Sequence, residues 1–271
     1  MSRRHSPDET VVYLYGVVTD ASPPPPADLR GIDDAPVRLV PAGSLAAIVS
    51  DVGAAAYTQE AVEAGLTDVG WAGERGVEHE RVLTWFVDRT TVIPSAPFSL
   101  HAGEERVVER LAEHRQRLEE AARRLAGHRE MGVRIWRHEE AFVAQLGEHS
   151  LPLRQLAGEM DGAAPGRRYL LGRKFEALRA EESVRITEQV VRQAAGELRA
   201  ISADARTLPI PSAGPADRTR TLVLHAAYLV ADAASKNFEA TVQQLASTHR
   251  QAGLEWEFTG PWPPYHFVGA A

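Results

Sequence analysis

The residue types that carry catalysis occur in this sequence without the spacing that catalysis requires. His79-Glu80 begins like the zinc-binding motif H-E-x-x-H, but Leu83 stands where the motif needs its second imidazole. The segment 172–174 (GRK) lacks the upstream glycine and the following hydroxyl of a phosphate-binding P-loop. The glycines of the segment 70–76 do not form G-x-G-x-x-G, and the serine-hydrolase motif G-x-S-x-G is absent. The motifs therefore indicate no zinc, nucleotide or acyl-transfer site.

The remaining histidines and carboxylates are explained by ordinary core and surface positions. His225 lies within an apolar run, where a buried and hydrogen-bonded imidazole is more typical than a catalytic base. Adjacent acids such as Glu104-Glu105 diverge by about 100° on a helix, so they do not converge on one substrate atom. We therefore expect no catalytic residue, no cofactor and no metal ligand, and a protein that is not an enzyme. Five further histidines show no ligand spacing: His101, His114, His128, His138 and His149.

Composition narrows the class of protein further. The chain has 271 residues, 44% of them hydrophobic, which suits one large or two ordinary domains. The net charge of −7 gives no electrostatic case for nucleic acid, and no apolar segment approaches the ~18 residues of a membrane span. Cysteine is absent, which excludes disulfides and thiolate sites. We expect a cytoplasmic protein without a signal peptide and with no nucleic-acid or membrane partner.

The first half of the chain predicts an α+β domain. Its patterns alternate between β-branched runs typical of strands and the 3-and-4 spacing typical of helices. Prolines limit the segment 92–100 to an edge strand or an extended loop. After a disordered lead at 1–10, the domain is expected to span 11–130, with a strand at 11–18, a hairpin of 37–40 and 45–49, helical structure at 58–89 that breaks near its glycines, and one continuous helix at 104–127.

The second half predicts a modified ferredoxin-like domain over 131–271. Its elements follow the order strand, helices, strand, strand, helix, strand, which is the βαββαβ pattern of that fold. A very long helix follows a loop rich in glycine and proline, so the pattern carries a long helical insertion. The expected elements are a strand around 133–135, a helix at 139–147, the loop at 158–166, the long helix at 167–201, strands at 205–210 and 221–230 joined by a turn at 211–217, a helix around 238–252 and a strand at 254–258.

The tail at 260–268 (GPWPPYHFV) crowds three prolines and three aromatic residues together. Proline removes a backbone donor and fixes φ, so the tail cannot form a helix or a central strand. The rings of Trp262, Tyr265 and Phe267 need cover from water. These three residues are candidates for a latch onto the chain's own domains or for docking of a partner. A latch is favoured, because exposed aromatic clusters are a solubility liability.

Short segments along nearly the whole chain have sequences similar to those of one protein family. They are Tyr13–Val18 (YLYGVV), Leu45–Val52 (LAAIVSDV), His79–Leu83 (HERVL), Thr91–Pro94 (TVIP), Gly166–Lys174 (GRRYLLGRK), Ala226–Val230 (AAYLV) and the tail. On these residues the chain resembles the gas vesicle protein F/L family, and the tail is the most specific piece. The loop Ser95–Phe98 (SAPF) departs from the Leu-Arg-Phe-Gly-like sequence usual there, so no role is carried over to it.

The resemblance implies a non-enzymatic accessory protein of gas vesicle formation. Members of that family assist assembly of the protein-shelled, gas-filled compartments that give cells buoyancy. The implied partners are the small, apolar major shell protein and other gas vesicle accessory proteins, with association to the vesicles as an assembly factor or minor component. The resemblance also implies two α+β domains, of which the second is a modified ferredoxin-like fold.

A second hypothesis belongs to a different class of protein. Ferredoxin-like domains host many unrelated functions, so the chain is alternatively a small-molecule-binding regulatory or enzymatic α+β protein. His225 on its apolar strand motivates this reading. A deep pocket with convergent polar groups would favour it.

Overall fold

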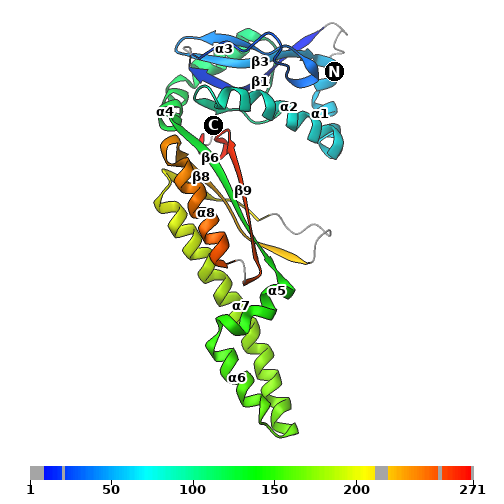
Figure 1. Cartoon of the computed structure of the whole chain (residues 1–271). Coiled ribbons are helices and arrows are strands. Elements are labelled where there is room, and N and C mark those ends of the chain that lie inside the picture. The colour runs from blue at the N-terminus through cyan, green and yellow to red at the C-terminus, as the bar shows by residue number, and fades with distance from the viewer. Residues whose placement is uncertain (1–8, 20–21, 211–218, 250–251, 270–271) are drawn as a thin grey trace. The chain divides into compact units, whose positions relative to one another are not determined.

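The structure of the chain, a computed structural model, has a mixed α and β fold (Figure 1). It describes residues 9–19, 22–210, 219–249 and 252–269. The helices are α1 (Gln59–Thr67), α2 (Val69–Val87), α3 (Glu104–Glu113), α4 (Arg115–Leu125), α5 (Glu139–His149), α6 (Leu151–Asp161), α7 (Pro165–Ala200) and α8 (Ser235–His249). The strands are β1 (Thr10–Thr19), β2 (Arg38–Ala42), β3 (Leu45–Gly53), β4 (Val92–Pro94), β5 (Leu100–His101), β6 (His128–His138), β7 (Asp204–Thr207), β8 (Arg220–Ala231) and β9 (Leu254–Trp262).

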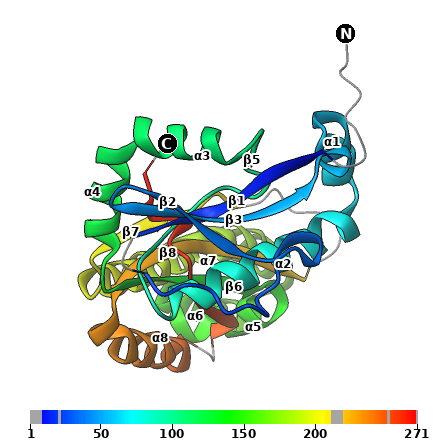
Figure 2. The same cartoon turned by 90° about the horizontal axis from the view of Figure 1, so that it is seen from above.

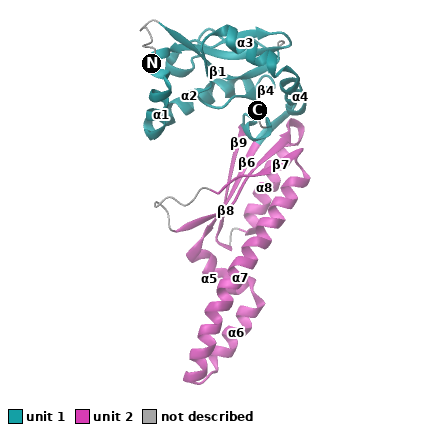
Figure 3. Ribbon diagram, turned by 180° about the vertical axis from the view of Figure 1, so that it is seen from behind, with its two compact units in different colours: residues 1–130, 262–271 teal, residues 131–261 magenta. Residues whose placement is uncertain are grey.

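The chain divides into two compact units (Figure 3). The first unit comprises residues 1–130 and 262–271, and the second comprises residues 131–261. The chain passes from the first unit to the second within β6 and returns within β9. The sequence-based division placed the whole tail in the second domain. In the structure the tail residues from Trp262 onward belong to the first unit. The second unit is therefore an insertion into the first.

The sheet of the first unit is buried on both faces. Its strands lie in the order β2-β3-β1-β4, β5 also pairs with β1, and the pairs that involve β1 are antiparallel. Tyr13, Tyr15 and Val18 of β1 face a core shared with α2. Leu14 and Val17 face the opposite side, toward residues of α3 and α4. Figures 1 and 2 show α2 and α3 on opposite sides of this sheet.

Two helical boundaries in the first unit differ from the sequence-based expectation. The helix expected at 104–127 is two helices, because His114 has the non-helical angles φ −108° and ψ 11°. The break lets α3 pack on β2 and β3 while α4 packs on β4, so tertiary packing overrides the continuous helical pattern. The helical segment expected at 58–89 breaks at Asp68, not at a glycine. The Asp68 carboxylate caps α2 by accepting from the backbone N–H of Gly70 and Trp71.

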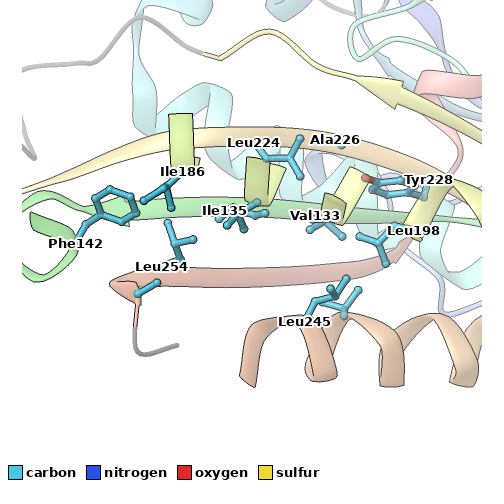
Figure 4. Packing of buried hydrophobic residues seen from close by; sticks show 14 of the residues in the cluster. Val133, Ile135, Phe142, Ile186, Leu198, Leu224, Ala226, Tyr228, Leu245 and Leu254 are labelled. Atoms are coloured by element: carbon cyan, nitrogen blue, oxygen red, sulfur yellow. The ribbon is translucent and has the colours of Figure 1, made fainter. Parts of the chain in front are cut away.

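The sheet of the second unit has the strand order β7-β8-β6-β9. One face carries the core, to which β6 contributes Val133 and Ile135 and β8 contributes Leu224, Ala226 and Tyr228. Residues of α7 and α8 pack against this same face, as Figure 4 shows for Leu198 and Leu245. The expected turn at 211–217 lies outside the described residues, as does most of the expected lead at 1–10. Thr10 already belongs to β1.

The other face of the second sheet carries an array of charged and aromatic side chains. Arg134 on β6 donates to Glu257 on β9 at 3.0 Å, and the Trp136 indole donates to the same carboxylate at 3.2 Å. The guanidinium of Arg220 lies 4.4 Å from the centre of the Trp136 ring. His138 Nε2 lies 2.6 Å from Glu255 Oε2. This face therefore satisfies its polar groups laterally, from strand to strand.

Helices α6 and α7 form a helical hairpin in the segment between β6 and β7. The loop expected at 158–166 is wrong, because α6 continues to Asp161 and α7 begins at Pro165. Pro165 is compatible with this start, since the first turn of a helix needs no proline N–H. Buried Ser150 caps α6 by accepting from the Leu153 N–H at 3.3 Å, and its hydroxyl donates to Glu182 of α7. Arg185 and Ser150 together lower the pKa of Glu182 to about 2. The cap and the carboxylate join the two helices.

Candidate functional site

The three candidate residues of the tail have different environments. Phe267 is buried, with 2% of its surface exposed, in a short 3-10 turn that spans Tyr265–Phe267. Tyr265 is half-buried and packs against the core that β1 shares with α2. Trp262 is 39% exposed. Phe267 and Tyr265 are therefore covered to different extents within the first unit, and Trp262 is the most exposed of the three.

Polar contacts fix the tail onto the first unit. The Tyr265 hydroxyl donates to Glu80 Oε2 of α2 at 2.9 Å. The backbone N–H of His266 donates to Glu130 at 3.0 Å, and its Nδ1 lies 2.6 Å from the other oxygen of that carboxylate. Arg124 donates to the Phe267 carbonyl. These contacts link residues 136 to 185 positions apart, which no local sequence pattern reveals.

A buried polar cluster lies below Tyr265. The Tyr13 hydroxyl accepts from the Phe98 N–H at 3.0 Å and also lies 3.0 Å from His79 Nδ1, where the tautomer of His79 sets which atom donates. The ring centres of His79 and Tyr265 are 6.5 Å apart. The Nε2 of His79 is buried and makes no hydrogen bond of ordinary geometry to a described residue. The hydrogen bond between Tyr13 and His79 therefore connects β1 with α2.

Burial sets the ionisation of this cluster. It lowers the pKa of His79 to about 4, and the backbone of Ser95 opposes the shift. Burial also raises the pKa of Glu80, although hydrogen bonds from the hydroxyls of Tyr265 and Thr84 lower it in part. Burial raises the pKa of Tyr265 as well. His79 is therefore neutral near pH 7. At 1% exposure it is closed to substrates, so the arrangement suits a structural connection better than proton transfer.

The sequence-level candidates for chemistry take ordinary positions. Leu83, where a zinc motif would need histidine, is fully buried in the core of the first unit. His225 lies on β8 but is half-buried, not buried as expected, and its Nδ1 lies 3.0 Å from the Pro209 carbonyl. Arg173 and Lys174 are exposed on α7. Within the described ranges, no three His, Asp or Glu side chains are grouped closely enough to hold a metal ion.

Two surface features were not found from the sequence. The first is a set of four large apolar side chains on α6 and α7 that are each more than half exposed: Leu151, Tyr169, Leu170 and Val184. The sequence carried a signal for it, because Tyr169 and Leu170 stand among the arginines of the segment GRRYLLGRK. The second is a groove of about 560 Å³ in the first unit, between the sheet and helices α3 and α4. It brings together segments remote in sequence, so only the fold defines it.

Comparisons with curated proteins identify relatives along nearly the full length. The chain is 27% identical over 268 residues to gas vesicle protein L of a Streptomyces species, covering 96% of this chain and 93% of the relative. It is also 27% identical over 262 residues to gas vesicle protein F of the same Streptomyces, covering 94% and 98%. Gas vesicle protein L1 of Halobacterium salinarum is 23% identical, with 94% and 89% covered.

Solved structures share the fold. The crystal structure of gas vesicle protein F from Anabaena superposes with a TM-score of 0.69 at 19% identity, over 97% of this chain and 99% of that one. The protein of the same name from Microcystis aeruginosa gives a TM-score of 0.62 at 18% identity, over 96% and 99%. In the described part of the chain, no helix combines the length and apolar character that crossing a bilayer requires.

The family itself is defined by a match to a family model. The model described as gas vesicle synthesis protein GvpL/GvpF matches residues 11–269, which include both units and the tail. The chain therefore belongs to the GvpL/GvpF family of gas vesicle synthesis proteins.

Proposed function

We propose that this chain is a non-enzymatic accessory protein of gas vesicle formation, which assists assembly by binding the small, apolar shell protein and other accessory proteins. The family match over residues 11–269 carries the proposal, because it spans the whole fold and not one domain. Relatives named gas vesicle proteins L and F align over nearly their full length. The protein acts in the cytoplasm at growing vesicles, as an assembly factor or a minor vesicle component.

Exposed apolar side chains at the start of α7 support a role in covering an apolar partner. Contiguous apolar side chains on the surface of a protein mark sites of contact with a partner. Tyr169 and Leu170 are adjacent on α7 with 68% and 67% of their surfaces exposed, and Arg173 and Lys174 follow within a turn. A shell subunit with much apolar surface aggregates unless it is covered. This surface offers contact area, and the nearby cations keep the free protein soluble.

The second unit supports a description as a modified ferredoxin-like domain. Its order of elements, the sheet order β7-β8-β6-β9 and the packing of α7 and α8 on one face all fit that fold. Helices α5 and α6 with the first turns of α7 then form the insertion. An experimental structure with a different strand order would contradict this description.

The function is tested by co-purification and by gene deletion. The tagged full chain is co-expressed with a small, apolar gas vesicle shell protein, and we expect the two to co-purify. The variant Tyr169→Ser with Leu170→Ser should recover at least fivefold less shell protein. Val69→Ser with Val77→Ser is the matched control, because it removes two exposed apolar side chains elsewhere. No co-purification, together with normal vesicles after deletion of the gene, would show that the proposed function is wrong.

A further inference from the structure

The groove in the first unit has an apolar floor and a cationic rim. Leu14 and Val17 of β1 contribute to its floor, with Ile93 and Leu118 at the sides. The tail reaches it through Val268 and Gly269. Five basic side chains line the groove, and none of its lining residues is acidic. The basic residues are His101, Arg106, Arg110, His114 and Arg117.

The cations lie on two helices. Arg106 and Arg110 are one turn apart on α3, Arg117 follows on α4 beyond the break at His114, and each is exposed. Four positions correspond to about 6 Å at the rise of an α-helix, so carboxylates one helical turn apart match Arg106 and Arg110. Arg106 also pairs with Glu109 of its own helix. A partner that presents several carboxylates would meet more of these guanidinium groups than a small anion would.

Burial lowers the pKa of the neighbouring His101, and the positive charges of Arg110 and Arg106 lower it further. His114 also lines the groove, and its Nε2 is buried without a hydrogen-bond partner among the described residues. The chain carries a net charge of −7, so this cationic rim contrasts with its overall charge. The groove therefore attracts carboxylates locally.

The backbone of the floor excludes an occupant that binds as an extra strand. β1 pairs with β3 on one side and with β4 and β5 on the other. The Leu14 N–H donates to the Ser99 carbonyl at 2.8 Å, and the Ser95 N–H donates to the Tyr15 carbonyl at 2.9 Å. An occupant must therefore satisfy its own backbone hydrogen bonds, as an α-helix does.

We propose that this groove binds an amphipathic helix of a partner protein, whose apolar face enters the groove and whose edge of aspartate and glutamate side chains meets Arg106, Arg110 and Arg117. Such a helix is recognised by its apolar face and its carboxylates, whether or not the chain binds the shell protein. A chain that binds the shell protein without binding an acidic helix would contradict the groove proposal alone.

Two synthetic peptides test the proposal on the full chain. Each has 18 residues with leucine at 3-and-4 spacing, and one edge carries either glutamate or lysine at every fourth position. Fluorescence anisotropy should show at least tenfold tighter binding of the glutamate peptide, with the difference shrinking as salt rises. Binding of the glutamate peptide should also raise the pKa of His101, read by NMR, because carboxylates would offset Arg106 and Arg110. Equal binding of both peptides would overturn the proposal.

Charge reversal identifies the surface. The triple variant Arg106→Glu, Arg110→Glu and Arg117→Glu should bind the glutamate peptide at least tenfold more weakly and gain affinity for the lysine peptide. The matched control is the triple variant Arg154→Glu, Arg167→Glu and Arg173→Glu. These arginines are exposed in the second unit, and their replacement changes the net charge by the same amount. An unchanged affinity in the first variant, or an equal loss in the control, would contradict the proposal.

A second variant keeps every charge and guards against misfolding of the first. Leu118→Gln makes the wall of the groove polar and should weaken binding of the glutamate peptide about fivefold, with unchanged circular dichroism. Competition separates other occupants. If inorganic phosphate, an anionic lipid vesicle or a DNA oligonucleotide displaces the peptide at lower concentration than unlabelled peptide does, the groove is a general anion site and the proposal is wrong.

Discussion

The two sheets of this protein are buried in different ways. In β1 every residue from Val12 to Val18 is buried, because helices cover the sheet of the first unit on both faces. In β6 buried residues alternate with half-buried ones from Val133 to Trp136, because the core covers one face and ion pairs occupy the other. A continuous apolar run and an alternating one therefore report how many faces of a sheet are covered. The first sheet also takes part of its cover from the remote tail.

The largest effect is expected from the tail. Phe267→Ala should destabilise the first unit by about 3–5 kcal/mol, because it removes a fully buried ring. Trp262→Ala should cost under about 1.5 kcal/mol, because that ring is partly exposed. Urea unfolding measured by hydrogen exchange in each unit checks both values. Equal losses for the two variants, or a loss confined to the second unit, would contradict the dependence of the first sheet on the tail.

The next largest losses of stability are expected from alanine substitutions at adjacent residues of β1 and of β6. In β1, Val17→Ala and Val18→Ala should each cost about 1–3 kcal/mol, since both side chains are buried on opposite faces. In β6, Ile135→Ala should cost about 2–5 kcal/mol. Its neighbour variant Arg134→Ala should stay within about 1 kcal/mol, since its ion pair is exposed. Chemical denaturation of the four variants checks the pattern. A large loss for Arg134→Ala would show that both faces of the second sheet are covered.

A smaller effect is expected where the second unit buries polar groups. Ser150→Ala removes the cap of α6 and the hydroxyl that donates to Glu182, and should cost about 1–2 kcal/mol. Ser247→Ala is the control, because Ser247 is an exposed residue of α8, with an expected change within about 0.5 kcal/mol. Thermal unfolding followed by circular dichroism compares the two. No difference between them would show that the hairpin does not depend on this cap.

The smallest effect concerns the pH dependence of the first unit. Burial raises the pKa of Glu80, so this carboxyl contributes stability below its unfolded pKa of about 4.3 and loses it as pH rises through the folded value. Glu80→Gln keeps an acceptor for Tyr265 and cannot ionise. The variant should gain stability relative to the parent chain between pH 5 and pH 8, by about 1 kcal/mol or less. Urea unfolding at both pH values checks this difference.

His79 acts in the opposite direction within the same cluster. Its folded pKa of about 4 lies below the ordinary value of 6.5, so its contribution is present above about pH 6.5 and is lost as pH falls toward 4. Comparing each variant with the parent chain at the same pH removes this shared effect. Glu74→Gln on the exposed side of α2 is the control. A gain by Glu80→Gln that does not grow with pH would contradict the role assigned to burial.

Local patterns predicted most strands and helices, but not the contacts that make the site. The apolar run 11–18 and the alternating segment 254–258 correspond to β1 and β9. Both were predicted because the spacing of apolar residues in a strand reflects which of its faces are buried. The break at His114 and the whole of α6 were missed, because packing and capping decide them. The tail was recognised by its composition. Its partners Glu80 and Glu130 were not, since they lie more than 130 positions away.

The interrupted course of the first unit has a consequence for biosynthesis. Residues 131–261 are translated before the residues from Trp262 onward that return to the first unit. At typical synthesis rates this interval lasts on the order of ten seconds. During that time Glu80 and Glu130 lack Tyr265 and His266, and the place of Phe267 is empty. The segment made first is therefore completed last, and a ribosome that stops early releases a chain whose opening domain is still unfinished.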